Sequence, residues 1–143
     1  MSRWIETSRE AVTQSFLFNF LKVRFRSEAT SKTGVFDVLE TKDWVNVIAI
    51  TDKNEVVMVR QFRFGTQTLS LEFPAGIVEE NELPSVAAAR ELLEETGSSG
   101  PSMESIGRCR PNPAFLTNTC HHFLARGVKF HSAQSLDEQV THI

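Results

Sequence analysis

Apolar and polar residues alternate along the first half of the chain in a pattern typical of β-strands. In the stretch LKVRFR (residues 21–26), the apolar side chains would lie on one face and the basic side chains on the other. The runs GVFDVLE and WVNVIAIT are also β-rich, and TDKNE supplies a turn before VVMVRQFRF, which predicts a hairpin. In LSLEF, we expect Leu69, Leu71 and Phe73 on the buried side. The sequence therefore predicts successive strands from Phe16 onward.

A helical pattern replaces this alternation at Pro84. Residues 84–96 lack glycine and are rich in Ala, Leu and Glu, which are good helix formers. Pro84 suits the first helical turn, and Gly97 suits a left-handed C-terminal cap. At roughly 100° per residue, the side chains expected to face the core are those of Val86, Ala89, Leu92 and Leu93. Two β-like runs, MESIGRCR and TCHHFLARGV, follow, so the predicted fold class is α+β with a mixed sheet.

Length and composition describe an ordinary globular domain. The chain has 143 residues, 41% of them hydrophobic and 23% charged, which is enough for one core. We assign residues 1–15 to an N-terminal segment and residues 16–143 to the domain. A net charge of −3 gives no electrostatic footprint for nucleic acid, and SFLFNFLKV is too short to span a bilayer. With two cysteines and no secretory signal, the expected location is cytoplasmic, with neither nucleic acid nor a membrane as partner.

Acidic residues gather on one side of the predicted helix. Glu91, Glu94 and Glu95 fall within an arc of roughly 100°, and Arg90 is placed to pair with Glu94 four residues on. Like charges at this spacing weaken a helix by a few tenths of a kcal/mol per pair. Two interpretations are open: a solvated acidic face, or a site for a hard divalent cation, which favours carboxylate oxygens and relieves their repulsion.

The residues around the helix extend this cluster into a motif. From Gly76 onward the spacing is Gly-x5-Glu-x7-Arg-Glu-hydrophobic-x-Glu-Glu-x-Gly, which resembles the Nudix box of the Nudix hydrolases. One position departs from the family pattern, because Ser98 stands where a hydrophobic residue usually follows the last glycine. That position packs rather than reacts, so the departure concerns packing and leaves the chemistry intact. The resemblance implies a Nudix fold, with a mixed β-sheet sandwiched between helices.

The resemblance also implies a metal site. Nudix hydrolases cleave a nucleoside diphosphate linked to another group with Mg²⁺ or Mn²⁺. Matched by position, Glu91 and Glu95 would be metal ligands, Glu94 would be a further ligand or a water-mediated contact, and the carbonyl of Ala75 would complete the coordination. Arg90 would orient the glutamates through an ion pair with Glu82 or Glu94. Metal ions suit this reaction because they neutralise the diphosphate and generate a hydroxide-like nucleophile.

A second resemblance concerns the segment before the box. VVMVRQFRFGTQTLSLEFPAG is similar to the segment found in ADP-ribose pyrophosphatases and related nucleoside-diphosphate-sugar hydrolases. Arg63 is the candidate phosphate binder or else a surface strand arginine, and Trp44 either stacks on a nucleobase or packs internally. Glu72 either lines the site or is exposed on its strand. The full set of candidate substrate contacts is Trp44, Arg60, Arg63, Glu72 and Pro113.

A catalytic base is expected near the end of the chain. The segment SLDEQVTHI matches the first half of the Asp-Glu-x-Glu loop that the ADP-ribose group often uses, but Val140 replaces the second glutamate. Glu138 is therefore a candidate base or a solvated loop residue. It joins Arg90, Glu94 and Glu95 as the candidate catalytic residues. Family members normally continue with a further helix, so a missing or truncated C-terminal helix is expected here.

The resemblance favours a homodimeric enzyme that splits ADP-ribose or a nucleotide sugar into a nucleoside monophosphate and a sugar phosphate. Two alternatives stay open. The first is a Nudix pyrophosphohydrolase acting on (d)NTPs or dinucleoside polyphosphates. The second is a non-catalytic nucleotide-sensing Nudix domain. Such sensing domains usually lack one or more glutamates of the box, whereas Glu91, Glu94 and Glu95 are all present in this chain, which favours catalysis.

Overall fold

The computed structural model describes residues 3–131 and 140–142. The chain forms two compact units: an N-terminal unit made of residues 1–42 and 110–119, and a helix-bearing unit made of residues 43–109 and 120–143. The first boundary between them therefore follows Lys42, whereas the sequence was divided after residue 15.

The N-terminal unit is an antiparallel sheet of three strands in the order β1-β2-β3. Their bounds are Trp4–Gln14, Phe18–Ser27 and Thr33–Thr41. The predicted alternation in β2 is confirmed, because Leu21 and Val23 are buried while Lys22 and Arg24 are exposed. Within the segment before Ser15, residues 4–14 form strand β1, which pairs with β2. Residues 110–119 join this unit through hydrogen bonds with Leu39 of β3.

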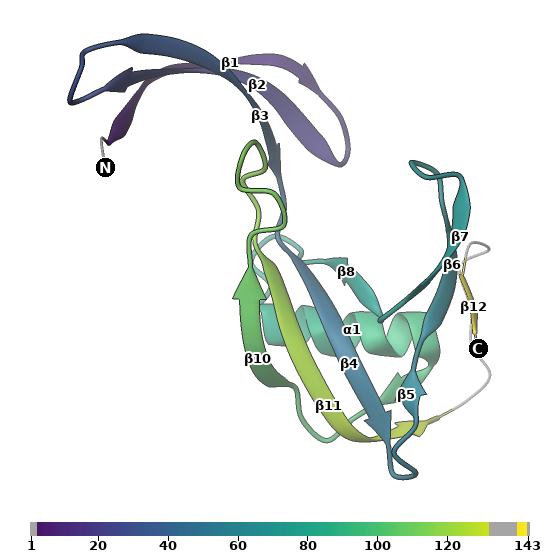
Figure 1. The fold of residues 1–143 in the computed structure, drawn as a ribbon. Helices are drawn as coiled ribbons and strands as arrows, with labels where there is room; N and C mark the ends of the chain where they lie inside the picture. The colour runs from purple at the N-terminus through teal and green to yellow at the C-terminus, as the bar shows by residue number, and fades with distance from the viewer. Residues whose placement is uncertain (1–2, 132–139, 143) are drawn as a thin grey trace. The chain divides into compact units, whose positions relative to one another are not determined.

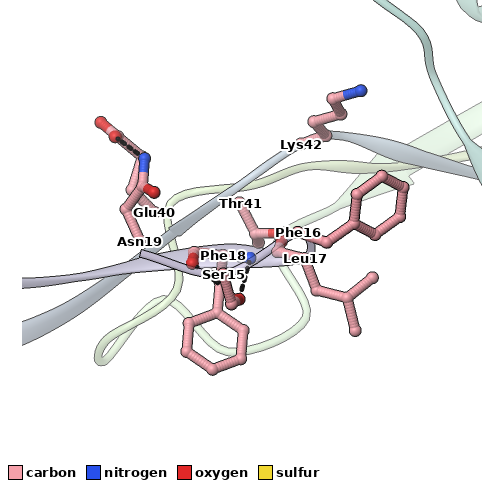
Figure 2. A pocket seen from close by; sticks show the side chains of 8 residues that line it. All are labelled: Ser15, Phe16, Leu17, Phe18, Asn19, Glu40, Thr41 and Lys42. Atoms are coloured by element: carbon pink, nitrogen blue, oxygen red, sulfur yellow. Dashed lines mark hydrogen bonds between the residues drawn. The ribbon is translucent and has the colours of Figure 1, made fainter. Parts of the chain in front are cut away.

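A shallow pocket at the β1–β2 turn shows how the polar groups of this unit are used (Figure 2). Ser15 Oγ donates to the carbonyl of Phe18 at 2.9 Å, and Asn19 Nδ2 donates to Glu40 Oε2 at 3.2 Å. Thr41 Oγ1 donates to the carbonyl of Leu17 at 2.7 Å. These bonds hold the turn and the ends of β2 and β3 together. The polar groups of the pocket therefore serve the structure of the sheet.

The helix-bearing unit is built on a mixed sheet (Figure 1). Strand β4 (Trp44–Thr51) runs parallel to β11 (Cys120–Phe130), and β10 (Glu104–Cys109) is antiparallel to β11. The short strands β5, β8 and β9 extend the sheet, with β5 and β8 on β4 and β9 on β11. Their bounds are Val56–Val57, Ala75–Ile77 and Ser98–Ser99. The predicted α+β class with a mixed sheet is confirmed.

A second small sheet in this unit has the order β12-β6-β7. The bounds of these strands are Val140–His142, Val59–Arg63 and Thr68–Glu72. The prediction that Leu69, Leu71 and Phe73 are buried was wrong, because they are 64%, 56% and 37% exposed. The alternation is real but its faces are reversed. Glu72 turns to the half-buried side because it pairs with Arg63 across the hairpin.

Helix α1 (Pro84–Thr96) is the one helix within the described residues, and it has the predicted ends. Gly97 adopts the left-handed conformation (φ 60°) and its N–H donates to the carbonyl of Leu93 at 2.8 Å. Figure 1 shows α1 lying across the sheet, with contacts to β4, β8 and β11. None of the helical structure in the described part of the chain has the length and apolar character needed to cross a bilayer.

The predicted core face of α1 was partly wrong. Leu92 is fully buried as expected, but Val86, Ala89 and Leu93 are exposed. Alanines take their place in the core. The buried residues of the helix are Ala87, Ala88, Leu92 and Thr96. Ala87, Ala88 and Leu92 share a core with valines and alanines of β4 and β11. Small side chains on both elements let the helix approach the sheet closely.

Candidate active site

Two glutamates of α1 pack against the backbone of β8. The N–H of Ala75 donates to Glu95 Oε2 at 2.9 Å. A Cβ placed on Gly76 would lie 1.9 Å from the carboxyl carbon of Glu91, so this position requires glycine because the carboxylate occupies the space. Strand β8 is itself paired with β4, through Val45 and its two neighbours. The helix and the sheet therefore bring two half-buried carboxylates, four residues apart, to one strip of backbone.

Burial makes negative charge unfavourable at both carboxylates. Burial raises the pKa of Glu95 to about 7, with Glu91 and Glu72 adding to the rise and the Ala75 N–H and Arg63 opposing it. Burial also raises the pKa of Glu91, against the lowering effect of Arg90. Desolvated carboxylates that repel each other are stabilised by a hard cation, which prefers oxygen ligands. The donor chemistry at this position therefore fits Mg²⁺ or Mn²⁺.

Arg90 ties the loop, the helix and β8 together. Its Nε and Nη2 donate to the two carboxylate oxygens of Glu82, each at 2.9 Å. Nη1 donates to Glu91 at 2.7 Å and to Glu94 at 3.1 Å, and Nη2 also reaches the carbonyl of Ile77 at 2.9 Å. The sequence left the partner open between Glu82 and Glu94, and the structure contains both bonds. Arg90 also lowers the pKa of Glu82 to about 2, so that Glu82 is fully ionised at neutral pH.

The geometry gives less support to the other two predicted metal contacts, which are Glu94 and the carbonyl of Ala75. The side chain of Glu94 is 58% exposed and accepts a hydrogen bond from Arg90. The structure shows the N–H of Ala75, rather than its carbonyl, in contact with Glu95. Within the described residues, no three His, Cys, Asp or Glu side chains converge closely enough to hold an ion. The fit to a cation therefore depends on Glu91 and Glu95.

An open pocket of about 450 Å³ adjoins β8. Its lining residues are Trp44, Asn46, Arg63, Glu72, Ala75, Gly76 and Ile77. Arg63 Nε donates to Glu72 Oε1 at 2.8 Å, and a second bond joins Nη2 to Oε2, so the pair is bidentate. Because Arg63 and Glu72 both influence the pKa of Glu95, the pocket and the carboxylates form one electrostatic unit. The structure thus brings Trp44, Arg63 and Glu72 together.

Sequence reasoning missed Asn46. Strand β4 alternates buried valines with half-buried residues, and Asn46 shares its face with Trp44. Its polar side chain in the otherwise apolar run WVNVIAIT was the signal that could have found it.

The remaining candidates lie elsewhere in the chain. Arg60 is exposed on β6 three positions before Arg63, so the two side chains leave the strand on opposite faces. Pro113 belongs to the N-terminal unit, where it lines an apolar pocket with Trp4 and Phe36 among its neighbours. Glu138 lies outside the described residues.

Comparisons with known proteins bear on the family and the fold of this chain. The family described as NUDIX domain matches residues 41–140. The methanol dehydrogenase activator of Bacillus methanolicus is 42% identical over 95 residues, which cover 66% of this chain and 51% of that protein. The ADP-ribose pyrophosphatase of Bacillus subtilis (strain 168) is 37% identical with the same coverage. The ADP-sugar pyrophosphatase of Mus musculus is 32% identical over 126 residues, covering 80% of this chain and 57% of its own length.

A solved structure, titled as the crystal structure of an ADP compounds hydrolase, superposes with a TM-score of 0.85 at 21% identity. It covers 99% of this chain and 77% of that one, which supports the fold. The chain spans about half the length of the curated relatives it matches.

Proposed function

The chain belongs to the NUDIX domain family, and from this premise we propose that it hydrolyses the diphosphate linkage of ADP-ribose or a nucleoside-diphosphate sugar. The products are a nucleoside monophosphate and a sugar phosphate, and the reaction depends on Mg²⁺ or Mn²⁺. One observation carries the proposal: Glu91 and Glu95 lie half-buried on the β8 backbone beside the pocket that contains Arg63. The names of the bacterial and mouse relatives support the substrate class.

Each residue beside β8 has a separate role in the proposed reaction, and that role follows from its position. Glu91 and Glu95 would hold the divalent ion, which would supply neutralisation of the diphosphate charge and activation of water. Arg90 fixes Glu91 and anchors the preceding loop through Glu82. The absence of a side chain at Gly76 leaves room for the Glu91 carboxylate. These contacts preorganise the carboxylates, so that little rearrangement is needed when charge develops on the diphosphate.

The pocket supplies recognition of the substrate. Arg63 presents a planar guanidinium, a group suited to bidentate phosphate binding, and Glu72 holds it in place before the substrate arrives. A phosphate that binds Arg63 competes with Glu72, and the release of Glu72 changes the charge near Glu95. Trp44 lines the same pocket and offers an aromatic surface for a nucleobase.

A substrate panel tests the proposal. ADP-ribose, several nucleoside-diphosphate sugars, dNTPs and a dinucleoside polyphosphate are incubated with Mg²⁺ or Mn²⁺, and the nucleotide and sugar phosphate products are separated chromatographically. We expect metal-dependent release of a nucleoside monophosphate from the first two groups, abolished by EDTA. A preference for dNTPs or dinucleoside polyphosphates would move the chain to another branch of the family. Tight binding without turnover of any compound would instead support a sensing domain.

We also propose a cytoplasmic homodimer. Large hydrophobic side chains are exposed on the N-terminal unit, among them Trp4, Phe16 and Phe36, and a second subunit would bury such a surface. Light scattering coupled to size-exclusion chromatography should give twice the chain mass. A monomeric mass across the micromolar range would refute the dimer without bearing on the hydrolase activity.

A further inference from the structure

Two free cysteines face each other across β10 and β11. Cys109 and Cys120 are register partners in this antiparallel pair, so their side chains lie on the same face of the sheet. Directly opposed residues in antiparallel strands have Cα atoms about 4.5 or 5.5 Å apart. Disulfides form across Cα separations of about 4.4–6.8 Å. The Cα spacing of either type of strand pair falls within this range, so the register of β10 and β11 places the two cysteines for a disulfide.

The two thiols have different access to solvent and to a base. Cys109 is exposed, and its Sγ lies 3.4 Å from Nε2 of His122, an imidazole that can accept the thiol proton. Cys120 is only 3% exposed. Burial raises the pKa of the Cys120 thiol, Trp44 lowers it and Cys109 raises it further. An external reagent therefore meets Cys109 first, because Cys120 is buried.

A metal site does not account for this cluster. Within the part of the chain that the structure describes, no group of three His, Cys, Asp or Glu side chains has the geometry to hold an ion. Core packing explains Cys120 but leaves the exposed Cys109 and its His122 contact without a role.

We propose that Cys109 and Cys120 form a reactive dithiol that takes up a low-molecular-weight disulfide and closes into an intramolecular disulfide. The Cys109 thiolate, its proton passed to His122, attacks one sulfur of the small disulfide and expels one thiolate, leaving a mixed disulfide. Cys120 loses its proton as it attacks the sulfur of Cys109, and the second small thiolate that it expels takes up a proton. Two protein thiols are oxidised, one small disulfide is reduced to two thiols, and the two protons end on those thiols. This reaction is independent of the proposed hydrolysis.

The position of the pair gives the reaction a consequence inside the molecule. Cys120 is the register partner of Trp44 across the parallel β4–β11 ladder, and Trp44 lines the pocket beside the carboxylates. The two cysteines also stand where the chain leaves the helix-bearing unit and returns to it, on either side of residues 110–119. The disulfide would therefore close this excursion at its base and change the surroundings of Trp44.

Oxidised glutathione is a direct probe. The full chain is incubated with it under native conditions, quenched in acid and analysed by intact mass and peptide mapping. We expect a transient glutathione adduct on Cys109, followed by a species that has lost two hydrogens and contains the Cys109–Cys120 link. Cys120→Ser should stop at the adduct. Cys109→Ser should react at least about tenfold more slowly than the wild type, because the remaining thiol is buried.

Fluorescence supplies a second readout on the same samples. In a Trp4→Phe background Trp44 is the remaining tryptophan, and closure of the disulfide should quench its emission reversibly, with recovery in dithiothreitol. The proposal is overturned if the native wild type keeps both thiols while a urea-unfolded sample reacts. It is also overturned if the folded wild type ends as a glutathione adduct without the internal link. Peptide mapping of the wild type decides between these results even if a cysteine variant fails to fold.

Discussion

The two faces of helix α1 differ in a way that its sequence conceals. On the inward face, Leu92 is fully buried, and on the outward face its neighbour Leu93 is 49% exposed. The same contrast separates Ala88, which is buried, from Ala89, which is exposed. The larger apolar side chains do not all point inward. Two features distinguish the inward face. Its side chains near the sheet are small, and two of its carboxylates reach the backbone of β8.

The close approach of α1 to β8 explains why the inward face carries small side chains and the two carboxylates. The carboxylate of Glu91 occupies the space of a missing side chain at Gly76, and Glu95 accepts a hydrogen bond from the backbone at Ala75. Both contacts require the helix to lie near the strand, and alanines at the contact permit this. The inward face is therefore shaped by the contacts of Glu91 and Glu95 with β8, and the outward face is free of that requirement.

The sharpest way to test the comparison is a polar substitution on each face. Glu95→Gln keeps the shape and the hydrogen-bond acceptor but removes the negative charge needed for a cation, so the proposed hydrolysis should fall by about 10³-fold. Leu93→Gln, on the outward face, should leave kcat within about twofold of the wild type. Steady-state kinetics at saturating Mg²⁺ measures both. Full turnover in the Glu95 variant would show that the hydrolysis does not require the Glu95 carboxylate.

The sequence could predict the ends of this helix but not its orientation. Pro84 and Gly97 mark the ends by backbone chemistry that acts locally, and both predictions are confirmed. The orientation was predicted from apolar periodicity, which assumes that the largest apolar side chains are buried. That assumption failed here because α1 packs on the sheet through alanines and through the contacts of Glu91 and Glu95 with β8. It failed in β7 for a related reason, since the pairing of Glu72 with Arg63 turned the apolar residues outward.

The candidate site residues were also only partly predictable from the sequence. The glutamates were found through the spacing of the box, because the helix repeat brings residues four apart together. The approach of Gly76 to Glu91 depends on the packing of β8 against α1, which a single sequence does not encode in any local pattern. The grouping of Trp44 with Asn46 could be read from alternation in β4. Pro113 entered only through resemblance, and it lies in the N-terminal unit.

Truncation of the adjacent leucines should separate the faces in stability. Leu92→Ala leaves a cavity in the core and should lower the free energy of unfolding by about 3 kcal/mol. Leu93→Ala removes a half-exposed side chain and should change it by less than about 0.5 kcal/mol. Urea unfolding monitored by circular dichroism measures both values. Equal losses would mean that the outward face is covered in solution.

Enlarging the adjacent alanines tests whether α1 must lie close to the sheet. Ala88→Leu forces extra volume between α1 and the sheet and should destabilise the protein by about 2 kcal/mol. Ala89→Leu adds the same volume to the outward face and should be nearly neutral. If closeness is what positions the carboxylates, the Ala88 variant should also lose activity at temperatures where it remains folded. Retained activity in a folded Ala88→Leu protein would contradict the account of the inward face.

The buried carboxylates should also make the metal-free protein sensitive to pH. The pKa of Glu95 is about 7 in the folded chain against an ordinary value of 4.5. The folded state therefore holds the proton more tightly, and the associated stability is complete below about pH 4.5 and lost as the pH rises through 7. Solvent screening of this half-buried group reduces the loss to the order of 1 kcal/mol.

The comparison is between urea midpoints of wild type and Glu95→Gln at pH 5 and pH 8 in EDTA. The variant should show a smaller decrease, with the remainder due to Glu91, whose pKa is also raised. Identical pH profiles would show that Glu95 is solvated rather than buried.

The smallest effect is expected at the rim between the two faces, where Glu94 pairs with Arg90. The bond is 3.1 Å long and the Glu94 side chain is 58% exposed, so water and salt screen it. Arg90 also keeps its bonds to Glu82, Glu91 and the Ile77 carbonyl when Glu94 is changed. Glu94→Gln should therefore lower the free energy of unfolding by only about 0.3 kcal/mol at low salt, and by less in 1 M NaCl. A loss above about 1 kcal/mol that persists in salt would place Glu94 with the inward carboxylates, because only a desolvated charge resists screening.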